Sequence, residues 1–422
     1  MNFIEELRWR GMLHDMTPGI EERIEEGSVV GYIGFDPTAP SMTIGNYVQI
    51  MLLHLFQKTG NKPIVLMGGA TGRVGDPSGK DKERQLKSAE ELDSNLNFQM
   101  EQVKKLLDFE GENAAVIRNN YDFYKEMNVL DFLRDAGKNL TVNYMMSKDS
   151  VKNRLESGLS YTEFSYQLLQ AYDYLCLLRQ DDCVVQMGGS DQWGNITSGT
   201  EFIRRNTDQK AYAVTTPLLT KADGSKFGKS EAGNIWLDPK MTSPYKFYQF
   251  WLNASDADLP KFLRYFTYKS KEEVEAMERE NADNPNAIKR AIAEELTVRV
   301  HSQEDFENVK KVTNLLFNSK TSPEELRGMN VVSLESVREE IPSFESSSLE
   351  FPTDLETVIC DHTEIFKSKS EFRRALKGNA ISLNKEKQND AARIVEGSDL
   401  LQGRFLMIEN GKKNKYILEI HN

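Results

Sequence analysis

Residues 32–47 combine polar side chains and glycines at the end of an apolar segment, an arrangement suited to binding an anion. The apolar run Val29–Ile33 predicts a buried strand, residues 36–38 predict a turn, and the apolar residues after Asn46 predict a buried helix. The first backbone N–H groups of a helix lack partners within it and attract anions. The segment therefore predicts a phosphate site, although an ordinary strand-to-helix turn has the same pattern.

The glycine-rich run 68–80 is a second candidate ligand-binding segment. It does not match a P-loop, because the spacing from Gly75 to Gly79 is one residue short and Asp81 stands where a serine or threonine would bind magnesium. Glycines still permit close approach of the backbone to a ligand, and Asp76 can accept hydrogen bonds. The run predicts a ligand-contacting loop without identifying the ligand.

Three hydrogen-bonding side chains recur at helical spacing in the segment 161–180: Tyr166, Gln170 and Asp173. They lie on a different face from the apolar stripe of that helix, which contains Phe164, Leu168, Ala171, Leu175 and Leu178. Aligned polar groups on a largely buried helix indicate the wall of a polar pocket. A solvent-facing stripe is the alternative, but the tyrosines on either side of Asp173 favour burial.

Two lysines, Lys226 and Lys229, flank Gly228 after an Asp-Gly turn. Lysines on a glycine-containing loop can close over phosphate groups. A charged surface loop is the simpler alternative.

The elements that must position these residues alternate along the chain. Strand candidates at 29–35, 63–67, 114–117, 183–187 and 212–215 are separated by helical patterns near 46–59, 88–108, 129–136 and 161–180. This order predicts an α/β fold with a mostly parallel sheet and ligands at the carboxyl ends of its strands.

The chain is long enough for two or three domains. Strand signals vanish after about residue 243, where helical patterns follow at 244–252, 257–266, 271–280 and 287–300. We expect a catalytic domain at 1–220, a helical domain with the lysine loop at 221–320, a linker rich in Ser, Glu and Pro at 321–353, and a small α+β domain at 354–422.

Composition indicates a soluble globular enzyme, with 39% apolar and 9% aromatic residues and a net charge of −12. No apolar run reaches the roughly 18 residues of a membrane span. The amphipathic N-terminus contains Glu5 and Glu6 and does not resemble a signal peptide. The three cysteines lack metal or redox spacing, which favours a reducing cytoplasm, and the five scattered histidines predict no protein-bound metal.

A local basic segment stands out in this acidic chain. Seven basic and two acidic residues lie between Lys367 and Lys387. A helix there would present a basic face to an RNA backbone. The alternative is a solvated charged helix.

Taken in order, the motifs resemble those of the bacterial-type tyrosyl-tRNA synthetase family, over essentially the whole chain. The segments that carry the resemblance are 32–38, 69–72, 75–80, 119–122, 143–146, 161–173, 188–196, 226–230 and 368–376. The resemblance implies a class I Rossmann-like catalytic domain, a helical anticodon-side domain, a small RNA-binding domain and a homodimer. It also implies that ATP, with Mg²⁺, activates L-tyrosine to tyrosyl-adenylate, and that the tyrosyl group then passes to the 3′ end of tRNA(Tyr).

The resemblance assigns the substrate tyrosine to one group of residues. The phenolic hydroxyl would bond to Tyr32 and Asp173. The ammonium group would be held by Asp76, Tyr166 and Gln170, and the carboxylate side by Gln192.

The resemblance assigns the nucleotide and the tRNA to other groups of residues. The adenylate and ribose would be lined by Gly34, Asp36, Thr38, Gly45, Gly189 and Asp191. The pyrophosphate would be held by Lys226, Lys229, Lys80 and Arg84. The tRNA would contact Lys369, Arg373, Arg374 and Lys377.

The chain departs from the family where the signature His-Ile-Gly-His is replaced by Thr43-Ile44-Gly45-Asn46. Thr43 and Asn46 can donate hydrogen bonds but cannot become cationic. We therefore expect the lysines, Arg84 and magnesium to carry more of the pyrophosphate charge. Two rival functions remain at this point: tryptophanyl-tRNA synthetase, whose indole site has no use for the Tyr32–Asp173 pair, and a non-catalytic RNA-binding paralogue.

Overall fold

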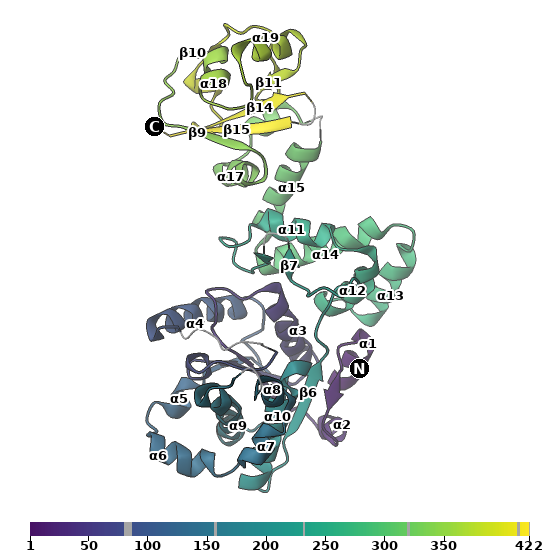
Figure 1. The fold of residues 1–422 in the computed structure, drawn as a ribbon. Coiled ribbons are helices and arrows are strands. Elements are labelled where there is room, and N and C mark those ends of the chain that lie inside the picture. The colour runs from purple at the N-terminus through teal and green to yellow at the C-terminus, as the bar shows by residue number, and fades with distance from the viewer. Residues whose placement is uncertain (80–86, 156–157, 231–232, 319–320, 412–413, 422) are drawn as a thin grey trace. The chain divides into compact units, whose positions relative to one another are not determined.

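The computed structural model describes residues 1–421 except 80–86, 156–157, 231–232, 319–320 and 412–413 (Figure 1). The chain forms two compact units. One comprises residues 1–242 and 250–300, and the other comprises residues 243–249 and 301–422. In the part of the chain that is described, no helix has both the length and the apolar character that a membrane crossing requires.

A parallel sheet with one antiparallel edge strand forms the centre of the first unit. Its strand order is β1-β6-β5-β2-β3-β4, and only β1 runs antiparallel to its neighbour. The strands are β1 Asp15–Met16, β2 Val30–Phe35, β3 Lys62–Met67, β4 Val116–Asn119, β5 Cys183–Gly189 and β6 Tyr212–Thr216. The α/β fold class predicted from the alternation of strands and helices is therefore confirmed.

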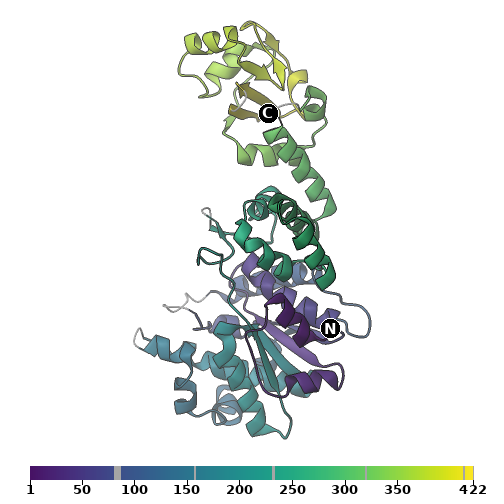
Figure 2. The same ribbon diagram turned by 90° about the vertical axis from the view of Figure 1, so that its right-hand side faces the viewer.

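Helices cover both faces of this sheet (Figures 1 and 2). They include α3 Ile44–Lys58, α4 Ala89–Lys104, α9 Tyr161–Asp181 and α10 Trp193–Asn206. Successive residues of β2 point to opposite faces. Tyr32 packs in a core with Leu168 and Leu175 of α9. The neighbouring Gly31 lies against Phe56 of α3, which a Cβ atom at this position would approach to 2.8 Å. The glycine thus lets β2 and α3 pack closely.

The carboxyl ends of β2 and β5 form the natural crevice of the sheet. From β2 the chain continues to β3 and β4 on one side, and it then crosses back to β5 and β6 on the other. Connections that diverge in this way leave an opening between the two neighbouring strands, where α/β proteins bind ligands.

The helices after residue 242 do not form the separate domain expected at 221–320. They are α11 Pro244–Leu252, α12 Leu259–Phe266, α13 Lys271–Glu280, α14 Pro285–Val300 and α15 Gln303–Phe317. Helices α12 to α14 belong to the first compact unit, whereas α15 belongs to the second. Arg299 of α14 donates hydrogen bonds to the Tyr47 hydroxyl of α3 at 3.0 Å and to the Phe266 carbonyl at 2.7 Å. The bond to Tyr47 joins α14 to α3 of the sheet-containing unit, and no local pattern reveals it.

The segment 321–353, expected to be a linker, is folded. It contains α16 Pro323–Arg327, α17 Val331–Glu340 and β9 Ser343–Ser346, and β9 pairs in parallel with β15 Asn414–Ile420. Ser322 caps α16, and Pro323 occupies the first turn of that helix, where a missing N–H costs nothing. Ser343 and Ser346 lie in β9, so the composition that suggested a linker belongs partly to a helix start and partly to a strand.

The second unit is built on a five-stranded sheet of order β12-β11-β14-β15-β9 in the described residues. Its other strands are β11 Ile381–Leu383, β12 Glu386–Lys387 and β14 Phe405–Asn410, and it is packed by α18 Leu355–Asp361 and α19 Lys369–Lys377. Phe372 and Leu376 of α19 are buried in its core.

Candidate active site

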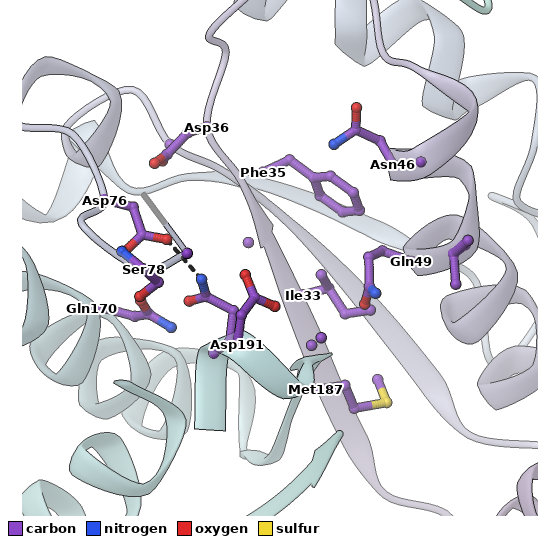
Figure 3. A pocket seen from close by; sticks show the side chains of 18 of the residues that line it. Ile33, Phe35, Asp36, Asn46, Gln49, Asp76, Ser78, Gln170, Met187 and Asp191 are labelled. Carbon is purple, nitrogen blue, oxygen red and sulfur yellow. Dashed lines mark hydrogen bonds between the residues drawn. The ribbon is translucent and has the colours of Figure 1, made fainter. Parts of the chain in front are cut away.

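A cavity of about 560 Å³ opens at the carboxyl ends of β2 and β5. Figure 3 shows Asp36, Asp76 and Gln170 on one side of β2 and Asn46 and Gln49 of α3 on the other. Most residues singled out from the sequence line this cavity: Tyr32, Gly34, Asp36, Thr38, Gly45, Asn46, Asp76, Tyr166, Gln170, Asp173, Gly189, Asp191, Gln192 and Lys226. The fold thus brings together segments that are far apart in the sequence.

Tyr32 and Asp173 are buried polar residues of the cavity lining. Both residues are only 1% exposed. Among the described residues, the Tyr32 hydroxyl has no hydrogen-bond partner, although it is buried. A buried hydroxyl is costly to leave unbonded, so this atom is suited to a partner supplied by a ligand.

The Asp173 carboxylate is held by one donor on each oxygen. The Tyr124 hydroxyl donates to Oδ1 at 2.6 Å, and the Asn120 amide donates to Oδ2 at 2.9 Å. Burial raises the pKa of Asp173 to about 7, and the negative charge of Asp36 adds to this rise, whereas the two hydrogen bonds oppose it. Asp173 therefore titrates near neutral pH.

Asp36 stands at the turn after β2 and joins the two walls of the cavity. The Tyr166 hydroxyl donates to its Oδ2 at 2.9 Å, and the Thr71 hydroxyl donates to its Oδ1 at 2.6 Å. Gly68 permits this contact, because a Cβ atom there would lie 2.1 Å from Asp36 Oδ1. Burial, together with the nearby carboxylates, raises the pKa of Tyr166 well above its usual value, so it remains a donor.

Asp76 forms a second buried acidic centre in the glycine-rich run. The Gln192 amide donates to its Oδ2 at 2.7 Å, and the backbone N–H of Ser78 donates to its Oδ1 at 2.9 Å. The Asn195 amide donates to the Ser78 hydroxyl at 3.1 Å. Asp76, Gln170 and Tyr166 together offer carboxylate, amide and hydroxyl oxygens, which are the acceptors that an ammonium group needs.

The two residues that replace the signature histidines bond to each other at the start of α3. The Thr43 hydroxyl and backbone N–H both donate to Asn46 Oδ1, at 2.8 and 2.9 Å, and the Asn46 N–H donates back to the Thr43 hydroxyl at 3.4 Å. This is a capping box. Asn46 lines the cavity and Thr43 does not. Because the Asn46 oxygen faces Thr43, its amide nitrogen is the group available to a ligand.

The lysine loop lies against the same helix start. Gly228 has φ +82° and a Cβ atom there would lie 3.4 Å from the Gly45 backbone nitrogen, so only glycine fits this approach without strain. The exposed Lys226 lines the cavity. Lys229 begins the two-residue strand β7 Lys229–Ser230. Lys80 and Arg84 lie outside the described residues.

Sequence reasoning assigned no role to Asn120, Thr71, Ser78 or Tyr124. Asn120 is fully buried and also donates to the Thr71 hydroxyl at 2.9 Å, so it connects the Asp36 and Asp173 networks. The sequence signal that could have indicated Asn120 is its place just after a predicted strand, where the other strands are also followed by glycine or polar residues. Tyr124 lies one turn further, on α5 Tyr121–Tyr124, and no spacing pattern links it to Asp173.

The four basic residues expected to contact tRNA are all exposed on α19. Arg373 pairs with Glu356 and Lys369 pairs with Asp361. Within the described part of the chain, Arg374 and Lys377 form no ion pair, which makes their charges available to an external anion.

One cluster in the described residues has the composition of a metal site: Glu345, Glu419 and His421 in the second unit. Glu419 is already paired with Arg338 at 2.8 Å and with Arg404. These cations neutralise the charge that a metal ion would require.

Two family models match the chain. The model described as "tRNA synthetases class I (W and Y)" matches residues 25–318, and the model described as "Tyrosine--tRNA ligase SYY-like C-terminal domain" matches residues 333–418.

Relatives and solved structures agree with these matches. A protein named tyrosine–tRNA ligase from Cytophaga hutchinsonii is 52% identical over 427 residues, which cover 100% of this chain and 100% of that one. A protein of the same name from Bacteroides thetaiotaomicron is 49% identical over 428 residues, which cover 99% of each chain. A C-terminally truncated mitochondrial tyrosyl-tRNA synthetase from Aspergillus nidulans is 30% identical, with a TM-score of 0.67 over 75% of this chain and 94% of that one.

Proposed function

The chain belongs to the class I tyrosyl-tRNA synthetases, and from this premise we propose the roles of its pocket residues. It is a tyrosine–tRNA ligase, which joins L-tyrosine to AMP at the expense of ATP and then transfers the tyrosyl group to tRNA. The observation that supports the proposed tyrosine site is the buried pair of Tyr32 and Asp173 beside an ammonium-binding set of oxygens.

Tyrosine recognition is proposed to occur at both ends of the substrate. The Asp173 carboxylate accepts a hydrogen bond from the phenolic hydroxyl of the substrate. The Tyr32 hydroxyl, which has no hydrogen-bond partner among the described residues, bonds to the phenolic oxygen. Asp76, Tyr166 and Gln170 hold the ammonium group, and Gln192, already bonded to Asp76, lies on the carboxylate side. The tyrosine carboxylate then points toward the nucleotide half of the cavity.

Activation needs positioning and charge stabilisation more than a nucleophilic side chain. The tyrosine carboxylate attacks the α-phosphate of ATP, the bond from this phosphorus to the bridging oxygen breaks, and pyrophosphate leaves with its negative charge. We propose that Gly34, Asp36, Thr38, Gly189 and Asp191 line the adenylate. Asn46, the N-terminus of α3 and Lys226 then face the phosphates, with Lys229, Lys80 and Arg84 added on the basis of the sequence motifs.

ATP is the nucleotide substrate of the family, and we propose that it enters as its magnesium complex. The signature histidines are replaced by neutral Thr43 and Asn46, so the phosphates need other positive charge. Because the reaction serves translation, we also expect the enzyme in the cytoplasm.

The two alternative functions weighed from the sequence are not supported. Relatives that match the full length at about 50% identity are named tyrosine–tRNA ligase. This favours the tyrosine enzyme over both a tryptophanyl-tRNA synthetase and a non-catalytic paralogue. The Tyr32 and Asp173 pair also has no use in an indole site.

A homodimer is proposed from exposed apolar side chains on one part of the first unit. On α6 Val129–Phe132, Val129 is 73% and Leu130 is 76% exposed, and Val142 at the start of α7 Val142–Met146 is 59% exposed. Large exposed apolar groups of this kind mark association surfaces. We expect Val129→Glu combined with Leu130→Glu to sediment as a monomer where the parent sediments as a dimer. The control is Phe98→Glu, which charges another exposed apolar residue, on α4. Unchanged sedimentation of the double variant would contradict this surface.

The tRNA is proposed to contact the basic face of α19. Replacing Arg374 and Lys377 together by alanine is expected to lower kcat/KM for tRNA charging about tenfold and to reduce the slope of log affinity against log salt by about two, because two phosphate contacts are lost. Tyrosine-dependent pyrophosphate exchange is expected to stay at the parent rate. The charge-matched control replaces the exposed Lys104 and Lys105 near the end of α4. An unchanged salt slope in the α19 variant would rule out direct phosphate contacts there.

A further inference from the structure

We propose that Tyr124 is a positioning residue for tyrosine recognition, whose hydroxyl holds the Asp173 carboxylate in the orientation and charge state that receives the substrate phenol. This proposal rests on the proposed role of Asp173 and deepens it. Tyr124 does not line the cavity itself, so it acts through Asp173.

The geometry gives the Tyr124 hydroxyl one principal acceptor. Its oxygen lies 2.6 Å from Asp173 Oδ1 and 2.9 Å from the Leu169 carbonyl oxygen, one turn earlier on α9. A phenol has a single proton, and a carboxylate is the stronger acceptor. The hydroxyl therefore donates to Asp173.

Aromatic contacts fix the Tyr124 ring in this position. Its centroid lies 5.7 Å from that of Tyr172 and 6.1 Å from that of Phe132. Burial, and then the proximity of Asp173, raises the pKa of Tyr124 well above its usual value. The phenol therefore keeps its proton throughout the range in which Asp173 titrates.

The surroundings of Asp173 explain why this donor matters. The titratable groups that face it are Tyr32 of β2, Asp36 of the following turn, Tyr124 of α5, and Tyr166 and Cys176 of α9. Burial keeps the tyrosines and Cys176 neutral, and Asp36 adds negative charge. Only the hydrogen bonds from Tyr124 and Asn120 are seen, among the described residues, to favour the ionised carboxylate.

Removal of the Tyr124 hydroxyl is therefore expected to raise the pKa of Asp173. A lost hydrogen bond to a charged group corresponds to about one pH unit. A protonated Asp173 no longer accepts the phenolic proton, so tyrosine binds less tightly at neutral pH. The pyrophosphate site is untouched, so the rate at saturating tyrosine should change little.

The test measures KM and kcat for tyrosine in ATP–pyrophosphate exchange between about pH 6 and pH 9, the range in which a carboxyl of this kind titrates. For Tyr124→Phe we expect KM to rise about fivefold near pH 7 and about tenfold near pH 6, kcat to stay within about twofold, and the midpoint of the pH dependence to move up by about one pH unit. At the alkaline end of the range the difference from the parent should largely disappear.

The matched control is Tyr172→Phe, which removes the hydroxyl of the tyrosine packed against Tyr124. It is expected to leave the midpoint where the parent has it. A parent-like KM and midpoint for Tyr124→Phe would overturn the proposal. So would a rise in KM that is equal at every pH, because this would indicate a packing effect. Asp173→Asn separates the two proposals: if it abolishes tyrosine activation while Tyr124→Phe behaves like the parent, only the role of Tyr124 fails, whereas full activity of Asp173→Asn would remove the proposed tyrosine site itself.

Discussion

Asp173→Asn is expected to lower kcat/KM for tyrosine in pyrophosphate exchange by at least about 100-fold, corresponding to about 3 kcal/mol. The substitution keeps the size of the side chain but removes the charge that accepts the phenolic proton in a fully desolvated site. It also places an amide where Tyr124 and Asn120 now donate to carboxylate oxygens, so one donor faces another. Steady-state exchange at varied tyrosine concentration measures this loss.

The pH dependence supplies a second readout of the same change. The pKa of Asp173 is raised to about 7, so the carboxylate is present above that pH and is lost as the pH falls through it. KM for tyrosine in the parent is therefore expected to rise as the pH falls below about 7. The Asp173→Asn variant has no such titration and should give a flat profile. The matched control is Asp181→Asn on the same helix, whose partner Arg118 is exposed and whose loss should cost little. A titration near pH 7 that persists in Asp173→Asn would assign it to another group.

Lys226→Ala is expected to lower the rate of tyrosine activation by about 10²–10³, with KM for tyrosine nearly unchanged. Lys226 lines the cavity, and we place it on the nucleotide side, away from the residues proposed to hold tyrosine. The start of α3 offers only neutral donors in this chain, so the loss of one ammonium group should be felt strongly by the departing pyrophosphate. Lys229→Ala is expected to act in the same direction on the basis of the sequence motif.

Single-turnover formation of tyrosyl-adenylate at saturating ATP and magnesium measures this effect. Lys240→Ala, which removes an exposed lysine outside the cavity lining, serves as the control for a general change of surface charge. Full activation by Lys226→Ala would mean that the charge at the pyrophosphate comes from elsewhere.

The walls of the site could be predicted where their polar residues recur at the spacing of a helix or follow the end of a strand. Tyr166, Gln170 and Asp173 are spaced by four and three residues, so one helix presents them on one face, and the fold places this face on the cavity. Tyr32, Gly34 and Asp36 follow from the end of a buried strand in the same way. Family motifs added further lining residues, such as Gly189, Asp191 and Lys226, but they assigned no role to Thr71, Ser78 or Asn120, which also line the cavity.

Features that depend on long-range contacts were not predictable from such patterns. Tyr124 and Asn120 reach Asp173 from 49 and 53 residues away, and no spacing rule connects them. The placement of α14 in the first unit is accompanied by a hydrogen bond from Arg299 to Tyr47, which is 252 residues away. The linker prediction was wrong for a different reason: its Ser and Pro residues suggested a flexible segment, but Ser322 and Pro323 begin a helix, and Ser343 and Ser346 lie in a strand.

The pairing of Tyr32 and Asp173 as a reader of the substrate hydroxyl is tested most directly by ATP–pyrophosphate exchange on the unmodified enzyme with tyrosine and with phenylalanine. A site that bonds a hydroxyl leaves buried polar groups unpaired when the hydroxyl is missing. Such sites reject the analogue by about 10⁴–10⁵, a range for which tyrosyl-tRNA synthetases themselves supply the reference case. We expect exchange with tyrosine and a kcat/KM for phenylalanine that is lower by several orders of magnitude. A kcat/KM for phenylalanine within about tenfold of that for tyrosine, the small difference that apolar packing alone provides, would contradict the assignment of this pair.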